Sequence, residues 1–212
     1  MKLHNFFRSG TSHRVRIAMA LKNIDYDYVP VSLPKEEHDT DAFAAINPQR
    51  LVPVLETEDG TFIQSLSIIE FLEQHYPTPA LYPLDPEERI KATTCAHLIA
   101  CDIHPVNNRR ILMYLRNELA QPEEAVSAWI AHWIAEGFQS LEKLLENQEC
   151  NGRFCVGSSP SIADVCLIPQ VESARRFNVD MSDYPLIASI DRHCNSLDAF
   201  VKAAPQNQPD AL

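Results

Sequence analysis

The pattern of apolar residues changes near the middle of the chain, and this change constrains the fold more than any other feature. Before residue 76, short β-rich segments alternate with segments of helical periodicity. Residues 76–88, YPTPALYPLDPEE, are rich in proline and typical of a linker. After the linker, only helical periodicity is found. This layout predicts a mixed α/β first half and an all-α second half, with domains at 1–80 and 87–212.

The elements of the first half are expected in the order βαβαββα. Periodicity places strands at 2–6, 26–31, 51–55 and 61–63, and helices at 12–22, 40–46 and from 65 onward. Thr11 or Ser12 is expected to cap the first helix, and Ser65 the third. Ser67 and Glu70 have the spacing of a capping box within that third helix.

The second half carries helical periodicity at 88–119, 123–145, 161–177 and 185–199. The S-x-x-D sequence formed by Ser161 and Asp164 predicts a capping box. Pro169 is expected to kink or break the helix that follows. The tail from residue 203, AAPQNQPDAL, is expected to be frayed.

Composition excludes several classes of partner and site. The 212 residues carry a net charge of −11, which argues against a nucleic-acid or anionic-membrane surface. We find no signal peptide and no apolar run near the ~20 residues that span a bilayer, so a cytoplasmic protein is expected. The cysteines show no CxxC and no zinc spacing, so we expect reduced thiols and no metal site: Cys95, Cys101, Cys150, Cys155, Cys166 and Cys194.

Four segments resemble the soluble glutathione transferases, and within them the zeta class. They are RVRIAMALK at 14–22, NPQRLVPVLE at 47–56, QSLSIIEFLE at 64–73 and SIADVCLIPQV at 161–171. The zeta class includes maleylacetoacetate and maleylpyruvate isomerases, and CDIHPVNNRRI at 101–111 is similar to the bacterial maleylpyruvate group. The resemblance implies a thioredoxin-like N-terminal domain, an all-α C-terminal domain, glutathione as cofactor and a homodimer.

One motif departs from the usual zeta pattern. Where that pattern has SSCS after the first strand, this chain has SGTS at residues 9–12. Thr11 therefore stands in place of the usual cysteine, which argues against cysteine-dependent side chemistry. The absence of CxxC at the same turn argues against disulfide exchange.

Three short motifs are expected to hold glutathione. Ser9, Gly10 and Thr11 lie between a strand and a helix N-terminus, where hydroxyls and the helix field favour a thiolate. By resemblance, Val52–Pro53 has a cis peptide bond and its backbone faces the cysteinyl part. Gln64–Ser65 at a helix N-terminus suits the γ-glutamyl carboxylate. Taken alone, each motif also fits an ordinary cap, turn or strand-start proline.

Further glutathione contacts are implied by the resemblance at His38, for the glycyl end, and at Asp102, His104, Asn108 and Arg109. The first long helix of the second half is expected to carry His104 and Asn108 on one face, because they are four residues apart.

Arginines are expected to bind the two carboxylates of the substrate. Arg8, Arg110 and Arg176 are the candidates, because arginine offers a bidentate fork to a carboxylate. In so acidic a chain the alternative is that they are solvated or paired with Asp and Glu. The sequence does not decide whether Arg109 or Arg175 takes such a role instead.

Together these features predict a glutathione-dependent cis–trans isomerase. A thiolate that adds to the cis double bond of a maleyl group, and then leaves, permits rotation to the trans fumaryl product. The preferred reaction is maleylpyruvate to fumarylpyruvate, with maleylacetoacetate left open because both substrates share the reacting bond. Two other interpretations are a general glutathione transferase or dehalogenase with an apolar pocket, and a non-enzymatic binding protein.

Overall fold

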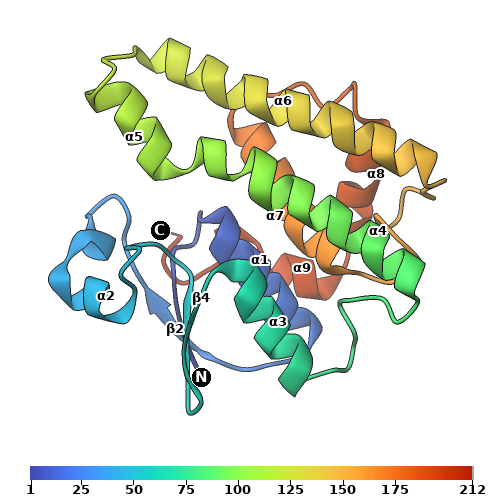
Figure 1. The fold of residues 1–212 in the computed structure, drawn as a ribbon, viewed down its shortest axis with the longest axis horizontal. Helices are drawn as coiled ribbons and strands as arrows, with labels where there is room; N and C mark the ends of the chain where they lie inside the picture. Colours follow the sequence, from blue (N-terminus) through green and yellow to red (C-terminus); the bar gives the residue numbers. More distant parts are fainter. Residues whose placement is uncertain (212) are drawn as a thin grey trace. The chain divides into compact units, whose positions relative to one another are not determined.

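The computed structural model describes residues 1–211, which form two compact units (Figure 1). Unit 1 contains Met1–Leu81 together with the C-terminal residues from Ser196 onward, and unit 2 contains Tyr82–Asn195. The sequence pattern instead predicts that the C-terminal residues belong to the helical domain, 87–212. They belong to unit 1 because helix α9 (Asp198–Ala203) packs against helix α1 (Gly10–Leu21).

Unit 1 is built on a four-stranded sheet of order β2-β1-β3-β4, in which only β1 and β2 are parallel. The strands are β1 (Lys2–Asn5), β2 (Asp27–Pro30), β3 (Val54–Thr57) and β4 (Gly60–Ile63). Helices α1 and α3 (Ser65–His75) lie to one side of the strands, and α2 (Asp41–Ile46) to the other (Figure 1). The predicted order βαβαββα and the thioredoxin-like fold are confirmed.

Several boundaries and caps in unit 1 differ from prediction. Strand β3 begins at Val54, because Pro53 has no N–H to donate to a ladder. The cap of α1 is Ser9, whose Oγ accepts from Ser12 N at 3.3 Å. Helix α3 already includes Ser67 and Glu70, so the capping box predicted there is wrong; Gln64 is the cap residue and makes no side-chain cap bond.

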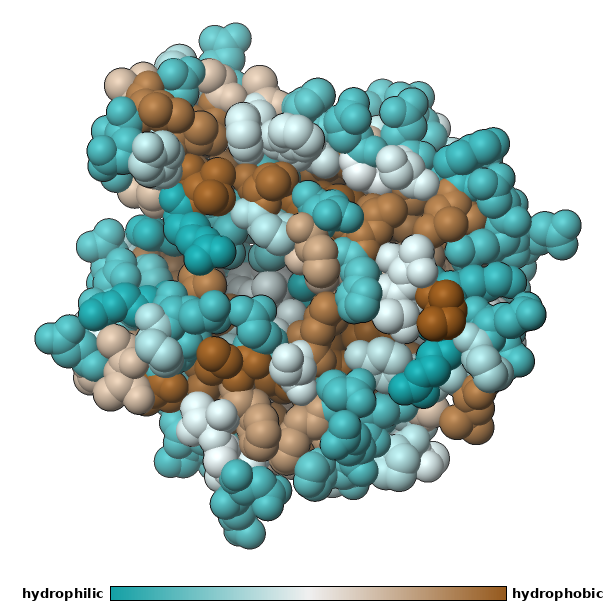
Figure 2. Space-filling view, viewed as in Figure 1, coloured by the Kyte–Doolittle hydropathy of each residue, from teal (hydrophilic) through white to brown (hydrophobic). Residues whose placement is uncertain are grey.

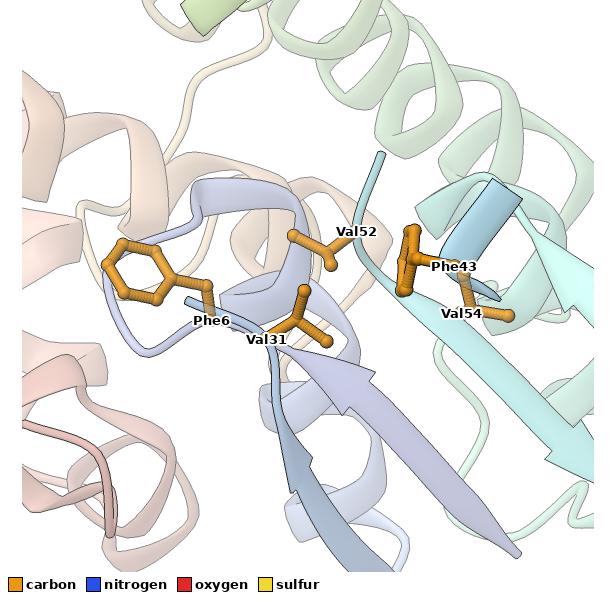
Figure 3. Close-up of a cluster of buried hydrophobic side chains, with 5 residues drawn as sticks. All are labelled: Phe6, Val31, Phe43, Val52 and Val54. Atoms are coloured by element: carbon orange, nitrogen blue, oxygen red, sulfur yellow. The ribbon is translucent and has the colours of Figure 1, made fainter. Parts of the chain in front are cut away.

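A cluster of buried side chains lies where the ends of these strands meet the neighbouring loops. It contains Phe6, Val31, Phe43, Val52 and Val54 (Figure 3). Val52 is a member of this apolar cluster, which anchors its side chain. The cluster therefore fixes the backbone just before Pro53.

Unit 2 is helical, and its first helix is not continuous over the predicted 88–119. Helix α4 (Pro86–His97) passes into a π-helical turn (Leu98–Ile103), a 3₁₀ turn (Pro105–Asn107) and helix α5 (Arg109–Asn117). Pro105 has no N–H for a helical bond, and the extended backbone at Asn108 starts α5, where Asn108 Oδ1 accepts from Arg110 N at 3.2 Å.

The other helices of unit 2 are α6 (Glu123–Asn147), α7 (Ile162–Arg176) and α8 (Pro185–Cys194). The capping box of α7 is confirmed: Asp164 Oδ2 accepts from Ser161 N at 2.8 Å and from Ser161 Oγ at 3.0 Å. The helix continues through Pro169, so the predicted break does not occur. Within the described range, no cysteine forms a disulfide bond.

The described tail, up to Ala211, is bonded to the rest of unit 1 and not frayed. The guanidinium of the buried Arg16 donates to Ala203 O at 3.1 Å and to Phe7 O at 2.8 Å. Asp210 accepts from Phe7 N at 3.2 Å and from the Tyr28 hydroxyl. Burial, followed by this bond to Asp210, raises the pKa of Tyr28 above its ordinary value. The tail thus holds the loop that leads to Ser9.

The surface is mixed in polarity. Apolar side chains gather over α5 and the adjoining part of α6, at the upper left of Figure 2, among hydrophilic ones. Among the large apolar side chains, Tyr114 and Leu119 are about half exposed. Among residues 1–211, no helix has both the length and the apolar character needed to cross a membrane.

Candidate active site

Ser9, Gly10 and Thr11 lie at the N-terminus of α1, and the two hydroxyls are in contact. Ser9 Oγ and Thr11 Oγ1 are 2.9 Å apart, and Thr11 Oγ1 donates to Val52 O at 3.0 Å. A hydroxyl has one hydrogen, so the Thr11 hydrogen is used at Val52 and the shared hydrogen belongs to Ser9. The structure therefore brings Ser9, Thr11 and Val52 together.

The segment before Pro53 is held in place from both sides. The Val52–Pro53 peptide bond is cis, as the resemblance implied. Asn47 is buried; its Nδ2 donates to Leu51 O at 2.7 Å and its Oδ1 accepts from Gln49 N at 2.9 Å. Sequence reasoning overlooked Asn47, although an asparagine before proline (Asn47-Pro48) is a recognised turn signal.

The N-terminus of α3 carries Ser65, whose side chain is buried. Ser65 Oγ accepts from Nη1 of Arg14, a buried residue of α1, at 3.4 Å. Gln64 has a left-handed backbone, with φ of 68°, and its Nε2 donates to Gln49 Oε1 at 2.8 Å. Sequence reasoning used Arg14 only as part of a family motif, because helical periodicity does not reveal that this arginine is buried.

His38 and Arg8 are the other candidates in unit 1. His38 is buried in the 3₁₀ turn Glu37–Asp39, with its Nε2 3.7 Å from Asp39 Oδ2. Arg8 is exposed, and its guanidinium carbon lies 5.9 and 5.3 Å from the ring centroids of Phe6 and Phe7. Within residues 1–211, Arg8 forms no ion pair with an acidic side chain.

The imidazole of His13, close to Ser9 on α1, is electrically neutral. His13 N donates to Ser9 O at 2.9 Å, so His13 is one turn along α1 from Ser9. Burial, helped by the nearby charge of Arg16, holds the pKa of His13 well below its ordinary value. The imidazole is therefore uncharged at neutral pH, and the helix N-terminus and the hydroxyls supply the local attraction for an anion.

The candidates of unit 2 around residue 104 do not share a helix face as predicted. His104 ends the π-helical turn, with its N–H donating to Ile99 O at 3.0 Å, whereas Asn108 is extended and caps α5. The four-residue spacing fails because the 3₁₀ turn separates the two residues. Asp102 is exposed within the π-helical turn, and Arg109 and Arg110 open α5.

The arginine pair at the end of α7 is divided between two environments. Arg175 forms an ion pair with Asp191, a buried residue of α8, and so has a structural role. Arg176 is exposed, and its guanidinium carbon lies 5.0 Å from the Phe177 ring centroid. Of the two, Arg176 is thus better suited to reach a ligand.

Comparison with known proteins decides the family. Residues 3–80 match the family described as Glutathione S-transferase, N-terminal domain. The chain is 54% identical over 211 residues to the maleylpyruvate isomerase of Ralstonia sp., with 100% of each chain covered. It is similar to a holo structure of a maleylpyruvate isomerase described as a bacterial zeta-class glutathione S-transferase, with 54% identity, full coverage of both chains and a TM-score of 0.98.

The chain belongs to the zeta class of the glutathione transferase family. A more distant zeta-type likeness is to the maleylacetoacetate isomerase of Methylobacterium extorquens AM1, solved with bound malonate and glutathione. That structure is 35% identical, both chains are fully covered, and the TM-score is 0.96.

The donor groups of this zeta-class chain fit glutathione. A thiolate suits the hydroxyl of Ser9 at the N-terminus of α1, and a carboxylate suits Ser65 at the N-terminus of α3. Within the described residues, no group of His, Cys, Asp and Glu has the arrangement of a metal site.

Proposed function

We propose that this protein is a cytoplasmic, homodimeric, glutathione-dependent isomerase that converts maleylpyruvate to fumarylpyruvate. The observation that carries the proposal is the 54% identity to a maleylpyruvate isomerase over the full length of both chains. The hydroxyl pair and the anion-binding N-terminus of α3 agree with it, because both suit glutathione.

When bound, glutathione supplies a thiolate whose reversible addition to the cis double bond allows that bond to rotate. The role of Ser9 is to donate its hydroxyl hydrogen to this sulfur. In the structure that hydrogen is directed at Thr11, so binding requires only that one hydroxyl rotates. Thr11 holds Val52 O at 3.0 Å and keeps this backbone in position.

The remaining glutathione contacts follow the motifs around this pair. Gly10 and Pro53 shape the backbone, Gln64 and Ser65 take the γ-glutamyl part, and His38 takes the glycyl end. In unit 2, the proposed contacts are Asp102, His104, Asn108 and Arg109. None of these roles needs an ionised histidine.

The substrate carboxylates are assigned to Arg8, Arg110 and Arg176. The lack of an ion pair at Arg8 within residues 1–211 and the exposure of all three side chains support this assignment. Arg175 is left out because Asp191 already engages it. Three arginines for two carboxylates leave one available for charge that develops on the substrate.

The test is the disappearance of maleylpyruvate, followed by its absorbance, in the presence and absence of glutathione. Isomerisation only with glutathione is expected, without net consumption of glutathione. Equal rates in both conditions would contradict the mechanism. Size-exclusion chromatography with light scattering tests the homodimer.

Maleylacetoacetate isomerisation is the second candidate, supported by the likeness to the maleylacetoacetate isomerase solved with glutathione and malonate. The ratio of kcat/KM for the two substrates separates the candidates. Conjugation of an apolar aryl halide at a higher kcat/KM than either diacid would favour a general transferase. Retention on immobilised glutathione without any turnover would favour a binding protein.

A further inference from the structure

Arg14 is a buried cation that the reaction as described does not use. Only 2% of the residue is exposed. Its Nη1 donates to Ser65 Oγ at 3.4 Å, and its Nε has no hydrogen-bond partner within residues 1–211. No carboxylate of the described residues lies within salt-bridge distance of it.

The neighbouring Arg16 shows how an arginine is normally accommodated in this unit. It lies on the same helix and is 1% exposed, yet its guanidinium bonds to Ala203 O, Asn5 Oδ1 and Phe7 O at 3.1, 3.0 and 2.8 Å. Its donors are thus satisfied by the protein itself. Arg14 differs because its one hydrogen bond within residues 1–211 is to Ser65, and its buried Nε has no partner there.

An unpaired buried guanidinium is unfavourable unless an anion compensates it. The guanidinium of Arg14, a residue of α1, reaches Ser65 at the N-terminus of α3, where unpaired N–H groups and the helix dipole already create a positive field. Arg14 and Ser65 are both buried, so the guanidinium charge and the field of the helix N-terminus act together out of contact with solvent. The group that relieves them must carry negative charge and be small enough to reach a helix N-terminus.

We propose that Arg14 is a positioning residue for the γ-glutamyl carboxylate of glutathione, acting through Ser65. By donating to Ser65 Oγ, Arg14 uses an acceptor position of that hydroxyl and leaves its single hydrogen directed at the ligand. The charge of Arg14 adds to the helix field and strengthens the bond to a carboxylate. This inference rests on the proposed use of glutathione.

The test compares two probes by isothermal titration: glutathione, and glutathione whose γ-glutamyl α-carboxylate is converted to the neutral amide. The wild type is expected to prefer glutathione. Arg14→Gln is expected to weaken glutathione binding about 10- to 100-fold while changing amide binding little. Arg14→Lys, which keeps the charge, is expected to recover part of the preference.

Ser65→Ala provides the coupling control. If Arg14 acts through Ser65, the loss caused by Arg14→Gln becomes much smaller in the Ser65→Ala background. Should Arg14→Gln not fold, the same comparison is made with Arg14→Lys, whose preference must then lie below that of the wild type. Thermal melting of every variant reports on folding independently of binding.

Two results would overturn the inference. One is an unchanged preference for glutathione over the amide in a folded Arg14 variant, and the other is an equal loss of both probes. Absence of glutathione binding by the wild type would instead contradict the proposed function. Since the measurement requires no turnover, an inactive but glutathione-binding protein still tests Arg14.

Discussion

At the scale of single residues, the site depends on how few hydrogens its hydroxyls carry. Thr11 gives its hydrogen to Val52 O, so Ser9 alone has one that is free to change partners. Thr11 occupies the position of the usual zeta cysteine, and its bond shows what the hydroxyl contributes there. We therefore propose different roles for the two residues: Ser9 donates to the glutathione sulfur, and Thr11 holds the backbone at Val52.

Ser9→Ala is expected to lower kcat about 10- to 100-fold, because a hydrogen bond to a charged group is removed. Without this donor the pKa of bound glutathione rises, so the ultraviolet absorbance of the thiolate appears at higher pH. Thr11→Ser, which keeps the hydroxyl, serves as the control and should titrate like the wild type. An unchanged titration in Ser9→Ala would contradict the role of Ser9.

Buried thiols make stability fall in alkaline solution. Burial, with the charge of Asp164 adding to it, raises the pKa of Cys95 to about 12 and also raises the pKa of Cys155 and Cys194. An unfolded thiol ionises near pH 8.5, so above that pH the unfolded state binds fewer protons than the folded one. This stabilisation is complete below about pH 8.5 and is lost as the pH rises.

Urea unfolding at pH 7.5, 8.5 and 9.5 is therefore expected to show a falling free energy of unfolding. Each buried thiol contributes a slope of up to about 1.4 kcal/mol per pH unit. Cys95→Ala should show a shallower fall than the wild type. If Cys95→Ala has the same slope as the wild type, the pKa of Cys95 is the same in the folded and the unfolded protein, which contradicts the prediction.

At the scale of elements, the π-helical turn at Leu98–Ile103 is the feature that sequence reasoning missed most clearly. The helical spacing of apolar residues continues through 88–119, because a π turn adds one residue without clearly interrupting that spacing. Pro105 was the available signal for an interruption. The consequence was a wrong face for His104 and Asn108.

Helix α6 lies so close to this turn at Gly137 that a side chain there would clash with Ile103. A Cβ at Gly137 would lie 2.2 and 2.3 Å from Cγ1 and Cδ1 of the buried Ile103. Gly137→Ala is therefore expected to cost about 1–3 kcal/mol from overpacking, partly offset by up to about 1 kcal/mol of helix propensity. Since Ile103 adjoins Asp102 and His104, KM for glutathione should rise as well.

Thermal melting and glutathione titration of Gly137→Ala check this expectation. Ile103→Ala in the same chain is the matched control, because it removes both Cγ1 and Cδ1, the atoms that the added methyl group would meet. The double variant should be more stable than the sum of the two single changes predicts. A melting temperature at or above that of the wild type in the single variant would show that α6 moves freely away from the turn.

Three other features could be predicted from the sequence. The order βαβαββα, the capping box of Ser161 and Asp164 and the cis Val52–Pro53 bond depend on local patterns or on the family likeness. The sequence does not single out Arg14 and Asn47, because what distinguishes them is burial, which depends on tertiary packing. A polar residue on a helix looks alike in sequence whether it faces solvent or a ligand.

At the scale of the whole molecule, the C-terminal tail supports the loop that carries Arg8 and Ser9. Asp210→Asn is expected to lower the melting temperature by a few degrees, because bonds to a charged group are worth about 1.5–3 kcal/mol. It should also reduce kcat more than it raises KM, since the loop leads to the thiolate donor. Gln206→Ala, an exposed tail position, is the control and should match the wild type.

The discontinuity of unit 1 has a consequence for how the protein is made. The strands and α1 are synthesised first, but Arg16 obtains its partner at Ala203 only when nearly the whole chain has been translated. The segment that forms unit 2 emerges in between. Unit 1, which carries Ser9 and Ser65, is therefore the last to be completed on the ribosome. A message truncated near its end would yield a finished unit 2 and an unfinished unit 1.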